Sequence, residues 1–261
     1  MSFNLRRGST TTPNSWAERR PVVAKLLRRE QPTVLGTQEG LYGQLKDIRR
    51  DLPDHYDWIG VGRGGGSHDE FMAVFHDARR LEPLEFEHFW LSDTPDVIGS
   101  RSWGNRTIRM VTWVRFADLR TGTEFVFVNT HFDHESEESR QRSAVLLRDR
   151  IGGFAPDLPI VVTGDFNTPA GISASYDTLV TSAGLTDTWT AAAERTGPLY
   201  ATFHGYGPLV PDGARIDWIL TRDVSVHAAA INTFTHDGRY PSDHLPVQAL
   251  ITLTARRPRT V

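Results

Sequence analysis

Apolar, strand-like segments of this chain repeatedly end in an acid, an amide or an imidazole. The clearest is residues 161–169, VVTGDFNTP, in which β-branched residues run directly into Asp165 and Asn167. An Asp or Asn after a strand is typical of a turn, and a turn explains any single ending of this kind. It does not explain why similar endings recur along the chain. If the strands align, their polar ends meet at the edges of a sheet, so the pattern constrains both the fold and the place of a site.

The predicted elements are mostly strands, with helices scattered between them. Strands are expected at residues 1–7, 33–39, 70–77, 108–116, 122–134, 158–167, 215–221, 224–234 and 246–254, and residues 81–92 are expected to be partly extended. Helices are expected at residues 14–30, 40–51 and 136–151. Ser15 and Glu18 have the spacing of a capping box, but Pro21 predicts an irregular or later start for the first helix. Two sheets packed face to face, with helices outside, would bury these strands in a single domain over residues 1–261.

Composition excludes several classes of protein. The chain contains no cysteine, which excludes disulfides, thiolate zinc sites and cysteine nucleophiles. The net charge of −3 gives no overall support to a non-specific DNA-binding protein, although a local basic groove is compatible with it. No stretch has the length of a transmembrane segment, and no signal peptide is recognised. Met1 already lies inside the first predicted strand, so we expect a cytoplasmic protein if the chain is complete and a secreted one if an upstream signal segment was removed.

The polar residues at the strand ends form one candidate site. In chain order they are Asn4, Gln38, Glu39, Asn129, Thr130, His131, Asp133, His134, Asp165, Asn167, Asp217, Asp243 and His244. Oxygen ligands such as Glu39 and Asp243 suit Mg²⁺ or Mn²⁺, and neighbouring histidines can stabilise or protonate phosphoryl oxygens. Asp217 requires a partner because Ile216 and Trp218 flank it. Each residue alone has an ordinary structural explanation, but their joint recurrence indicates a site.

These motifs resemble the endonuclease/exonuclease/phosphatase family, which has a DNase I-like fold. The matching segments are residues 2–6 (SFNLR), 37–40 (TQEG), 129–134 (NTHFDH), 163–167 (TGDFN), 215–219 (RIDWI) and 241–247 (PSDHLPV). They follow the family's order and cover nearly the whole chain, and GDFN and SDH are specific when they occur together. Residues 89–109 resemble a bacterial subgroup of uncertain substrate. The resemblance implies an α/β fold, a four-layer sandwich of two packed, mainly antiparallel β-sheets flanked by helices.

The resemblance also implies roles around a divalent metal, Mg²⁺ or Mn²⁺. Glu39 would be the principal metal carboxylate, with Asn4 in or near the same shell. Asp243 would support that metal or a second one. Asp165 would orient or deprotonate the attacking water, and Asn167 would hydrogen-bond the phosphate or that water.

The remaining catalytic roles fall to the other members of the motifs. His244 would contact the phosphoryl group, and Asp217 would fix its tautomer and orientation. His131 would stabilise the transition state or assist the leaving oxygen. The implied chemistry is in-line attack of water on phosphorus without a covalent enzyme intermediate.

A further set of residues is expected to bind substrate. They are Arg109, His134, His204, Tyr206, Arg239 and Tyr240. Arg109 is expected to face the phosphate, although a structural arginine is nearly as good an interpretation. The glycine-rich residues 60–71 lack the Gly-Lys-Ser/Thr ending of a nucleotide-binding loop, so a flexible loop before a strand is the favoured interpretation. The alternative is a loop that borders the site and brings Arg63 and His68 near the substrate.

The leading functional prediction is a metal-dependent phosphodiesterase or phosphatase that acts on a small-molecule or lipid-like phosphate ester. The negative net charge favours this over the first alternative, an endo- or exonuclease on DNA or RNA. The second alternative is a non-catalytic binding module on the same fold, and the complete set of motif residues argues against it. The oligomeric state stays open.

Overall fold

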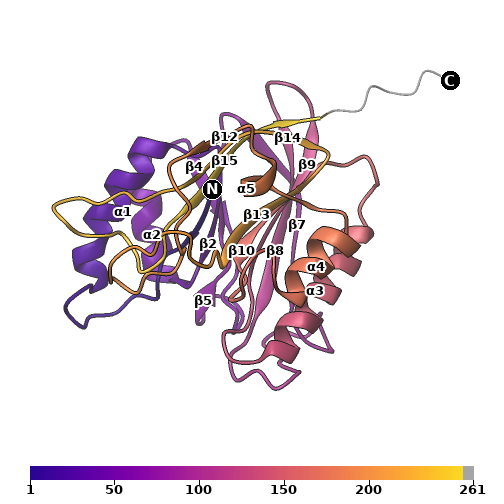
Figure 1. Ribbon diagram of the computed structural model, residues 1–261, viewed down its shortest axis with the longest axis horizontal. Helices are drawn as coiled ribbons and strands as arrows, with labels where there is room; N and C mark the ends of the chain where they lie inside the picture. Colours follow the sequence, from indigo (N-terminus) through magenta and orange to yellow (C-terminus); the bar gives the residue numbers. More distant parts are fainter. Residues whose placement is uncertain (255–261) are drawn as a thin grey trace.

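The computed structural model describes residues 1–254, so the last seven residues of the predicted domain lie outside the described part. Two β-sheets pack face to face, with helices on both outer sides, as Figure 1 shows. The seven-stranded sheet has the order β12 (Glu194–Thr196), β14 (Val224–Ile231), β15 (Val247–Leu253), β1 (Ser2–Asn4), β2 (Val34–Gln38), β6 (Val74–Asp77), β4 (Tyr56–Ile59). The six-stranded sheet has the order β11 (Thr186–Asp187), β13 (Asp217–Arg222), β10 (Ile160–Asp165), β9 (Glu124–His131), β8 (Met110–Asp118), β7 (Leu81–Trp90). A short pair, β3 (Gly40–Leu41) and β5 (Glu70–Phe71), lies beside them.

All but the last of the helices form the two outer layers, and the last lies against β13 and β14, one strand from each sheet. The helices are α1 (Trp16–Glu30), α2 (Tyr42–Asp51), α3 (Glu137–Gly152), α4 (Ala174–Asp177) and α5 (Thr188–Ala191), with a π-helical turn, η1 (Thr178–Ser182). In Figure 1, α1 and α2 lie on one side of the sheets, and α3 and α4 lie on the other. The predicted four-layer sandwich is therefore confirmed. Most neighbouring strands are antiparallel, but the pairs β1–β2, β9–β10 and β12–β14 are parallel, so both sheets are mixed.

Side chains that alternate between the two faces of β10 show how the layers pack. Ile160 and Val162 belong to the same buried cluster as Leu147 of α3. Val161, which points to the opposite face, belongs instead to the buried cluster that contains Val247 of β15. The strand is thus apolar on both faces because one face meets a helix and the other meets the second sheet.

The first helix differs from its prediction. The capping box forms, because Ser15 Oγ accepts from the amide of Glu18 and the Glu18 carboxylate accepts from the amide of Ser15. The helix begins at Trp16 and continues through Pro21, so the predicted irregular or later start is wrong. A proline there removes one main-chain hydrogen bond, and the capped first turn and the buried face of α1 outweigh that loss.

A buried amide joins the two sheets below the candidate site. Asn129 of β9 donates from Nδ2 to the carbonyl oxygens of Thr37 (2.8 Å) and Ala73 (3.0 Å) in the other sheet. Its Oδ1 accepts from Nε2 of Gln38 at 2.7 Å. Gly36 permits this approach, since a Cβ there would lie 2.6 Å from Asn129 Oδ1. Because these hydrogen bonds join the two sheets, they fix the position of the strand ends of one sheet relative to those of the other.

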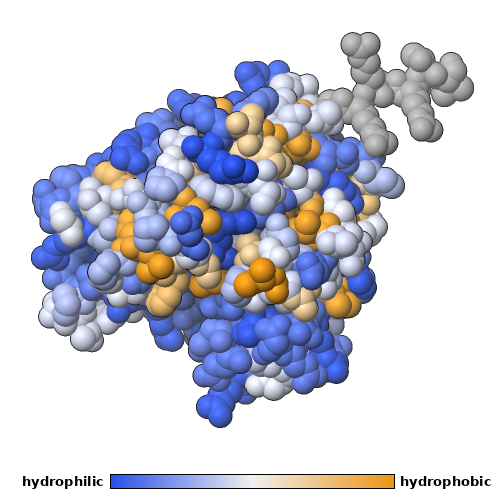
Figure 2. Space-filling model, in the orientation of Figure 1, coloured by the Kyte–Doolittle hydropathy of each residue, from blue (hydrophilic) through white to orange (hydrophobic). Residues whose placement is uncertain are grey.

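The surface gives two further observations. None of the helices within residues 1–254 has the length and apolar character needed to cross a membrane. The face drawn in Figure 2 is a mosaic in which hydrophobic residues are interrupted by hydrophilic ones.

Candidate active site

Strand register places three of the predicted residues in one row across the ends of three adjacent strands of the six-stranded sheet. His131 at the end of β9 lies opposite Asp165 at the end of parallel β10. Asp217, the first residue of antiparallel β13, lies opposite the other side of Asp165. All three side chains are nearly completely buried. Asp165 therefore stands between an imidazole and a second carboxylate.

The seven-stranded sheet brings Asn4 and Glu39 to the same place. Strands β1 and β2 run parallel with Asn4 opposite Gln38, the residue before Glu39. Nδ2 of Asn4 donates to Oε1 of Glu39 at 3.0 Å and to Oδ2 of Asp165 at 2.9 Å. Its Oδ1 accepts from the amide of Arg6 at 2.9 Å, which orients the side chain. One amide thus links carboxylates from the two sheets.

His244 lies against this group and is paired with Asp217. Nδ1 of His244 is 3.0 Å from Oδ2 of Asp217, and Nε2 is 3.8 Å from Oδ2 of Asp165. Burial lowers the pKa of His244, but the carboxylates of Asp217 and Asp165 outweigh burial and raise it to about 10. The ring is therefore an imidazolium near neutral pH, with Nε2–H directed toward the space beside Asp165.

The two site carboxylates differ in proton affinity. Burial and the neighbouring Asp217 carboxylate raise the pKa of Asp165 to about 7. Burial also disfavours the charged form of Glu39, but hydrogen bonds from the Asn4 side chain and the Arg7 amide hold the pKa of Glu39 below its usual value. The pair therefore offers one permanent anion beside a group that can accept a proton near neutral pH.

Part of this cluster suits a divalent cation. Glu39, Asp165 and His244 place side-chain oxygen and nitrogen atoms within 4.8 Å of one another, and with His244 protonated the two carboxylates are the available ligands. Carboxylate oxygens are the ligands that Mg²⁺ and Mn²⁺ prefer, and Oε1 of Glu39 and Oδ2 of Asp165 converge because both accept from Nδ2 of Asn4. The residues present therefore fit a metal held chiefly by Glu39, with Asp165 beside it and free to act on a water molecule.

Asn167 orients His131 through the turn after β10. Asn167 has φ +50°, a left-handed conformation that Asn tolerates better than most residues. Its Nδ2 donates to the carbonyl of Phe132 at 3.0 Å and lies 3.0 Å from Nε2 of His131. Burial and the nearby Arg109 guanidinium lower the pKa of His131, so the ring is neutral and Nε2 accepts from Asn167. The GDFN turn therefore positions both the Asp165 carboxylate and the Asn167 amide that contacts His131.

Arg109 belongs to a charged group near His131. Nη2 of Arg109 is 2.9 Å from Nδ1 of His134, and Nε is 3.6 Å from Oδ2 of Asp133. Arg109 is 3% exposed, and Asp133 is also buried. The structure therefore brings Arg109 and His134 together at the side of the site, and phosphate binding by either remains a prediction.

Glu70 is an acid near the site that was not assigned a role from the sequence. Glu70 of β5 places Oε2 2.7 Å from Nη1 of Arg63 and Oε1 3.7 Å from Nη1 of Arg7. Burial raises the pKa of Glu70 to about 7. Residues 60–71, expected to be a flexible loop, form a hydrogen-bonded turn in which the amide of Arg63 donates to Glu70. The acid at the start of the predicted strand 70–77 was the signal that could have identified it.

The other predicted residues lie on the rim. His204 is buried, with Nε2 3.2 Å from the carbonyl of Ser242 and its ring 4.4 Å from that of Tyr240. Tyr206 packs under the guanidinium of Arg6, 4.9 Å from the ring centre. These side chains support the loop beside the site.

Two charged residues at the rim, Arg239 and Asp243, each form an ion pair. Arg239 pairs with Glu18 at the start of α1, 3.2 Å away, so it lies outside the group around Asp165. Asp243 lies beside Glu39 on the wall of a shallow hollow of about 610 Å³, 3.5 Å from Arg6. Metal support by Asp243 remains a prediction.

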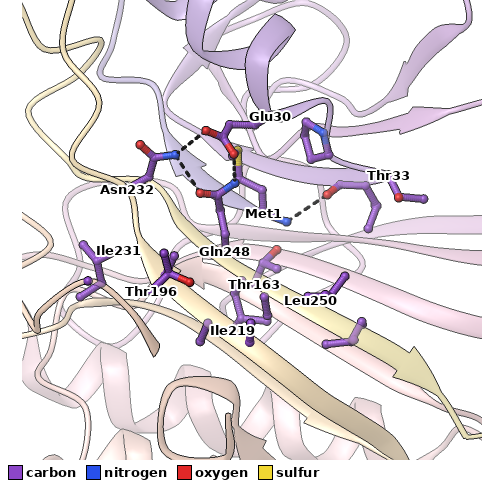
Figure 3. A pocket seen from close by; sticks show the side chains of 18 of the residues that line it. Met1, Glu30, Thr33, Thr163, Thr196, Ile219, Ile231, Asn232, Gln248 and Leu250 are labelled. Carbon is purple, nitrogen blue, oxygen red and sulfur yellow. Dashed lines mark hydrogen bonds between the residues drawn. The ribbon is translucent and has the colours of Figure 1, made fainter. Parts of the chain in front are cut away.

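A cavity of about 740 Å³ lies away from this site. It opens between the sheets near the beginnings of β1 and β2, at Met1 and Val34, whereas the acids lie at the strand ends. Figure 3 shows its main polar group, in which Asn232 and Gln248 bond to Glu30. Because these polar groups satisfy one another, we place the chemistry at the smaller hollow beside Glu39.

Comparisons with known proteins agree with this geometry. Residues 1–244 match the model of the Endonuclease/Exonuclease/phosphatase family. The mannosyl-6-phosphatase Bt3783 of Bacteroides thetaiotaomicron is similar in structure, with a TM-score of 0.90 and 34% identity over 96% of this chain and 98% of that one. An endonuclease/exonuclease/phosphatase of Bacteroides vulgatus has a TM-score of 0.90 and 35% identity, covering 97% of both chains. The uncharacterized protein L388 of Acanthamoeba polyphaga mimivirus is 27% identical over 95% of this chain and 97% of its own length.

Proposed function

The chain belongs to the endonuclease/exonuclease/phosphatase family, and from this premise we propose that it is a divalent-metal-dependent phosphatase acting on a small, sugar-like phosphomonoester. The observation that carries the proposal is the placement of Asp165. This acid stands beside Glu39, His131 and the Asp217–His244 pair, with a pKa of about 7. A bound Mg²⁺ or Mn²⁺ would polarise a phosphoryl oxygen and neutralise developing charge.

The protein's own groups can perform the remaining steps. Asp165 accepts a proton from the attacking water as the new O–P bond forms. His244, held by Asp217, donates a hydrogen bond from Nε2 to a phosphoryl oxygen and stabilises its charge. The P–O bond to the alcohol breaks on the opposite side, and the leaving oxygen takes a proton from solvent, because His131 is neutral and its Nε2 accepts from Asn167. Inorganic phosphate and the free alcohol are the products.

Substrate size follows from the hollow and the charge of the chain. A hollow of about 610 Å³ lies within the range of about 300–1,000 Å³ typical of small-ligand sites. Its Arg6 and Arg7 supply positive charge locally, while the 29 basic residues of the whole chain are outnumbered by 32 acidic ones. Long duplex DNA would need a track of basic contacts, so it is expected to be a poor substrate. The similarity to a mannosyl-6-phosphatase favours a sugar phosphate among small esters.

A substrate panel tests the proposal. The protein is assayed with Mg²⁺ and with Mn²⁺ against mannose 6-phosphate, other hexose phosphates, glycerol phosphate, an inositol phosphate, a phosphodiester, a phospholipid and plasmid DNA. We expect phosphate release from the hexose phosphates and its loss in Asp165→Asn. Asp165-dependent cleavage of DNA without turnover of any small ester would establish the nuclease alternative. Absence of turnover on every substrate would favour the binding module.

A further inference from the structure

Phe203 presents a half-exposed aromatic ring beside the proposed phosphoryl-binding histidine. Its ring centre lies 5.0 Å from that of His244, and the residue is 50% exposed. It does not belong to the buried clusters of the described chain. Burial in a core therefore does not explain the position of this ring.

The backbone fixes that position. The amide of Leu245 donates to the carbonyl of Thr202 at 2.7 Å, and the amide of His204 donates to Asp243 at 2.9 Å. These two bonds flank Phe203 and His244, which are directly opposite each other in a short antiparallel bridge. Such a non-hydrogen-bonded pair brings its two side chains close together on the same face.

The two sides of the His244 ring differ in polarity, and this difference indicates how a bound substrate is oriented. On one side, Nε2 lies 3.5 Å from Nδ2 of Asn4 and 3.8 Å from Asp165, and these neighbours are buried and polar. Phe203 flanks the ring with a surface that solvent reaches. The reacting phosphoryl group needs the polar side, so its alcohol must project toward the exposed side.

We propose that the ring of Phe203 binds the apolar face of the leaving alcohol and sets the preference of the site for ring-shaped alcohols. The inference rests on the proposed phosphatase function. A pyranose has a face of C–H groups that packs on an aromatic ring, whereas glycerol has no comparable face. The ring contact contributes to binding of the alcohol and leaves the chemistry at phosphorus unchanged.

Kinetics of Phe203→Ala on two substrates test the proposal. We expect KM for a hexose 6-phosphate to rise about tenfold, the size of effect expected when about 50 Å² of apolar contact is lost. KM for glycerol 3-phosphate and kcat for both substrates should stay near their original values. Phe86→Ala is the matched control, because Phe86 is 55% exposed and also lies beside a histidine, His88, 5.9 Å away.

A binding measurement separates this inference from the proposed function. Titration calorimetry with Mg²⁺ compares Asp165→Asn with the Asp165→Asn, Phe203→Ala double variant, using a hexose 6-phosphate and orthophosphate. We expect the double variant to bind the sugar phosphate more weakly than Asp165→Asn does, and to bind orthophosphate equally well. Equal effects on the two ligands, or no effect on either, would overturn the role of Phe203. Lack of turnover by the unmodified protein would instead overturn the phosphatase function, and the binding result would still decide the role of Phe203.

Discussion

Oδ2 of Asp217 lies 3.0 Å from Nδ1 of His244, and both side chains are almost completely buried. Asp217 begins β13, whereas His244 belongs to the loop before β15. The remaining imidazole nitrogen, Nε2, is thereby directed toward Asn4 and Asp165. This relationship makes Asp217 a positioning residue that acts through His244.

Asp217→Asn should lower kcat by about 10- to 100-fold, the range found when the partner of a functional histidine is removed. An amide can donate to Nδ1 and so favour the wrong tautomer, and it no longer supports the imidazolium. The pH–rate profile should change together with kcat. Asp118→Asn, which removes a remote acid paired with Arg80 at 2.7 Å, is the control for loss of an ion pair. An unaltered pH profile in Asp217→Asn would contradict the assignment.

Asn167 permits a comparison of two substitutions. Asn167→Ala and Asn167→Gly both remove the amide that contacts His131, so both should lose activity to a similar extent. Because φ is +50°, alanine is also strained, and Asn167→Gly should be the more stable by about 1 kcal/mol. Urea denaturation measures the difference. An alanine variant more stable than the glycine variant would show that the turn is not held in this conformation.

Asn129→Ala should destabilise the fold by about 2–4 kcal/mol, because it leaves buried carbonyl and amide groups of the opposite sheet without their partner. Thr37, Ala73 and Gln38 all lose a hydrogen bond. Asn105→Ala is a matched control, since Asn105 is also buried but its amide donates within its own loop to Thr107. Calorimetric unfolding should separate the two variants clearly. Similar losses would refute the role of Asn129 in joining the sheets.

His88 should make stability depend on pH. Burial lowers its pKa from 6.5 to about 4, so the unfolded chain binds a proton that the folded chain refuses between these values. Stability should therefore fall as the pH falls from 6.5 to 4, with His88 contributing about 1–2 kcal/mol after allowance for partial exposure. His88→Gln should reduce the slope of unfolding free energy against pH in this window. An identical slope in the variant would contradict the assignment.

The fold was predictable where one physical pattern dominated. The long apolar strands and the capped helices α1 and α3 were anticipated, because burial on two faces and end-capping both leave local patterns. Short elements such as β11, β12 and α5 were not, since two to four residues carry too little pattern and depend on tertiary contacts. Residues 81–92 were expected to be only partly extended, but β7 is continuous there because pairing with β8 stabilises a strand whose side chains are mostly exposed.

The site was predictable to a different degree. The order of the polar strand ends, together with the family resemblance, placed Asn4, Glu39 and Asp165 in one candidate centre. Sequence could not show that Arg239 turns toward α1, because a long exposed side chain pairs with whichever charge the fold brings near it. It also could not identify Phe203, whose relation to His244 depends on a bridge between two distant loops.

Phosphate release from a hexose 6-phosphate as a function of Mg²⁺ concentration, after chelation, tests whether Glu39 and Asp165 form a metal-dependent phosphatase centre. The unmodified protein should be inactive without the cation and recover fully with it. Glu39→Gln removes one ligand charge, so it should raise the Mg²⁺ concentration for half-maximal rate by on the order of 100-fold while preserving the fold. Full activity after chelation, or an unchanged Mg²⁺ dependence in Glu39→Gln, would contradict a metal-dependent phosphatase centred on Glu39 and Asp165.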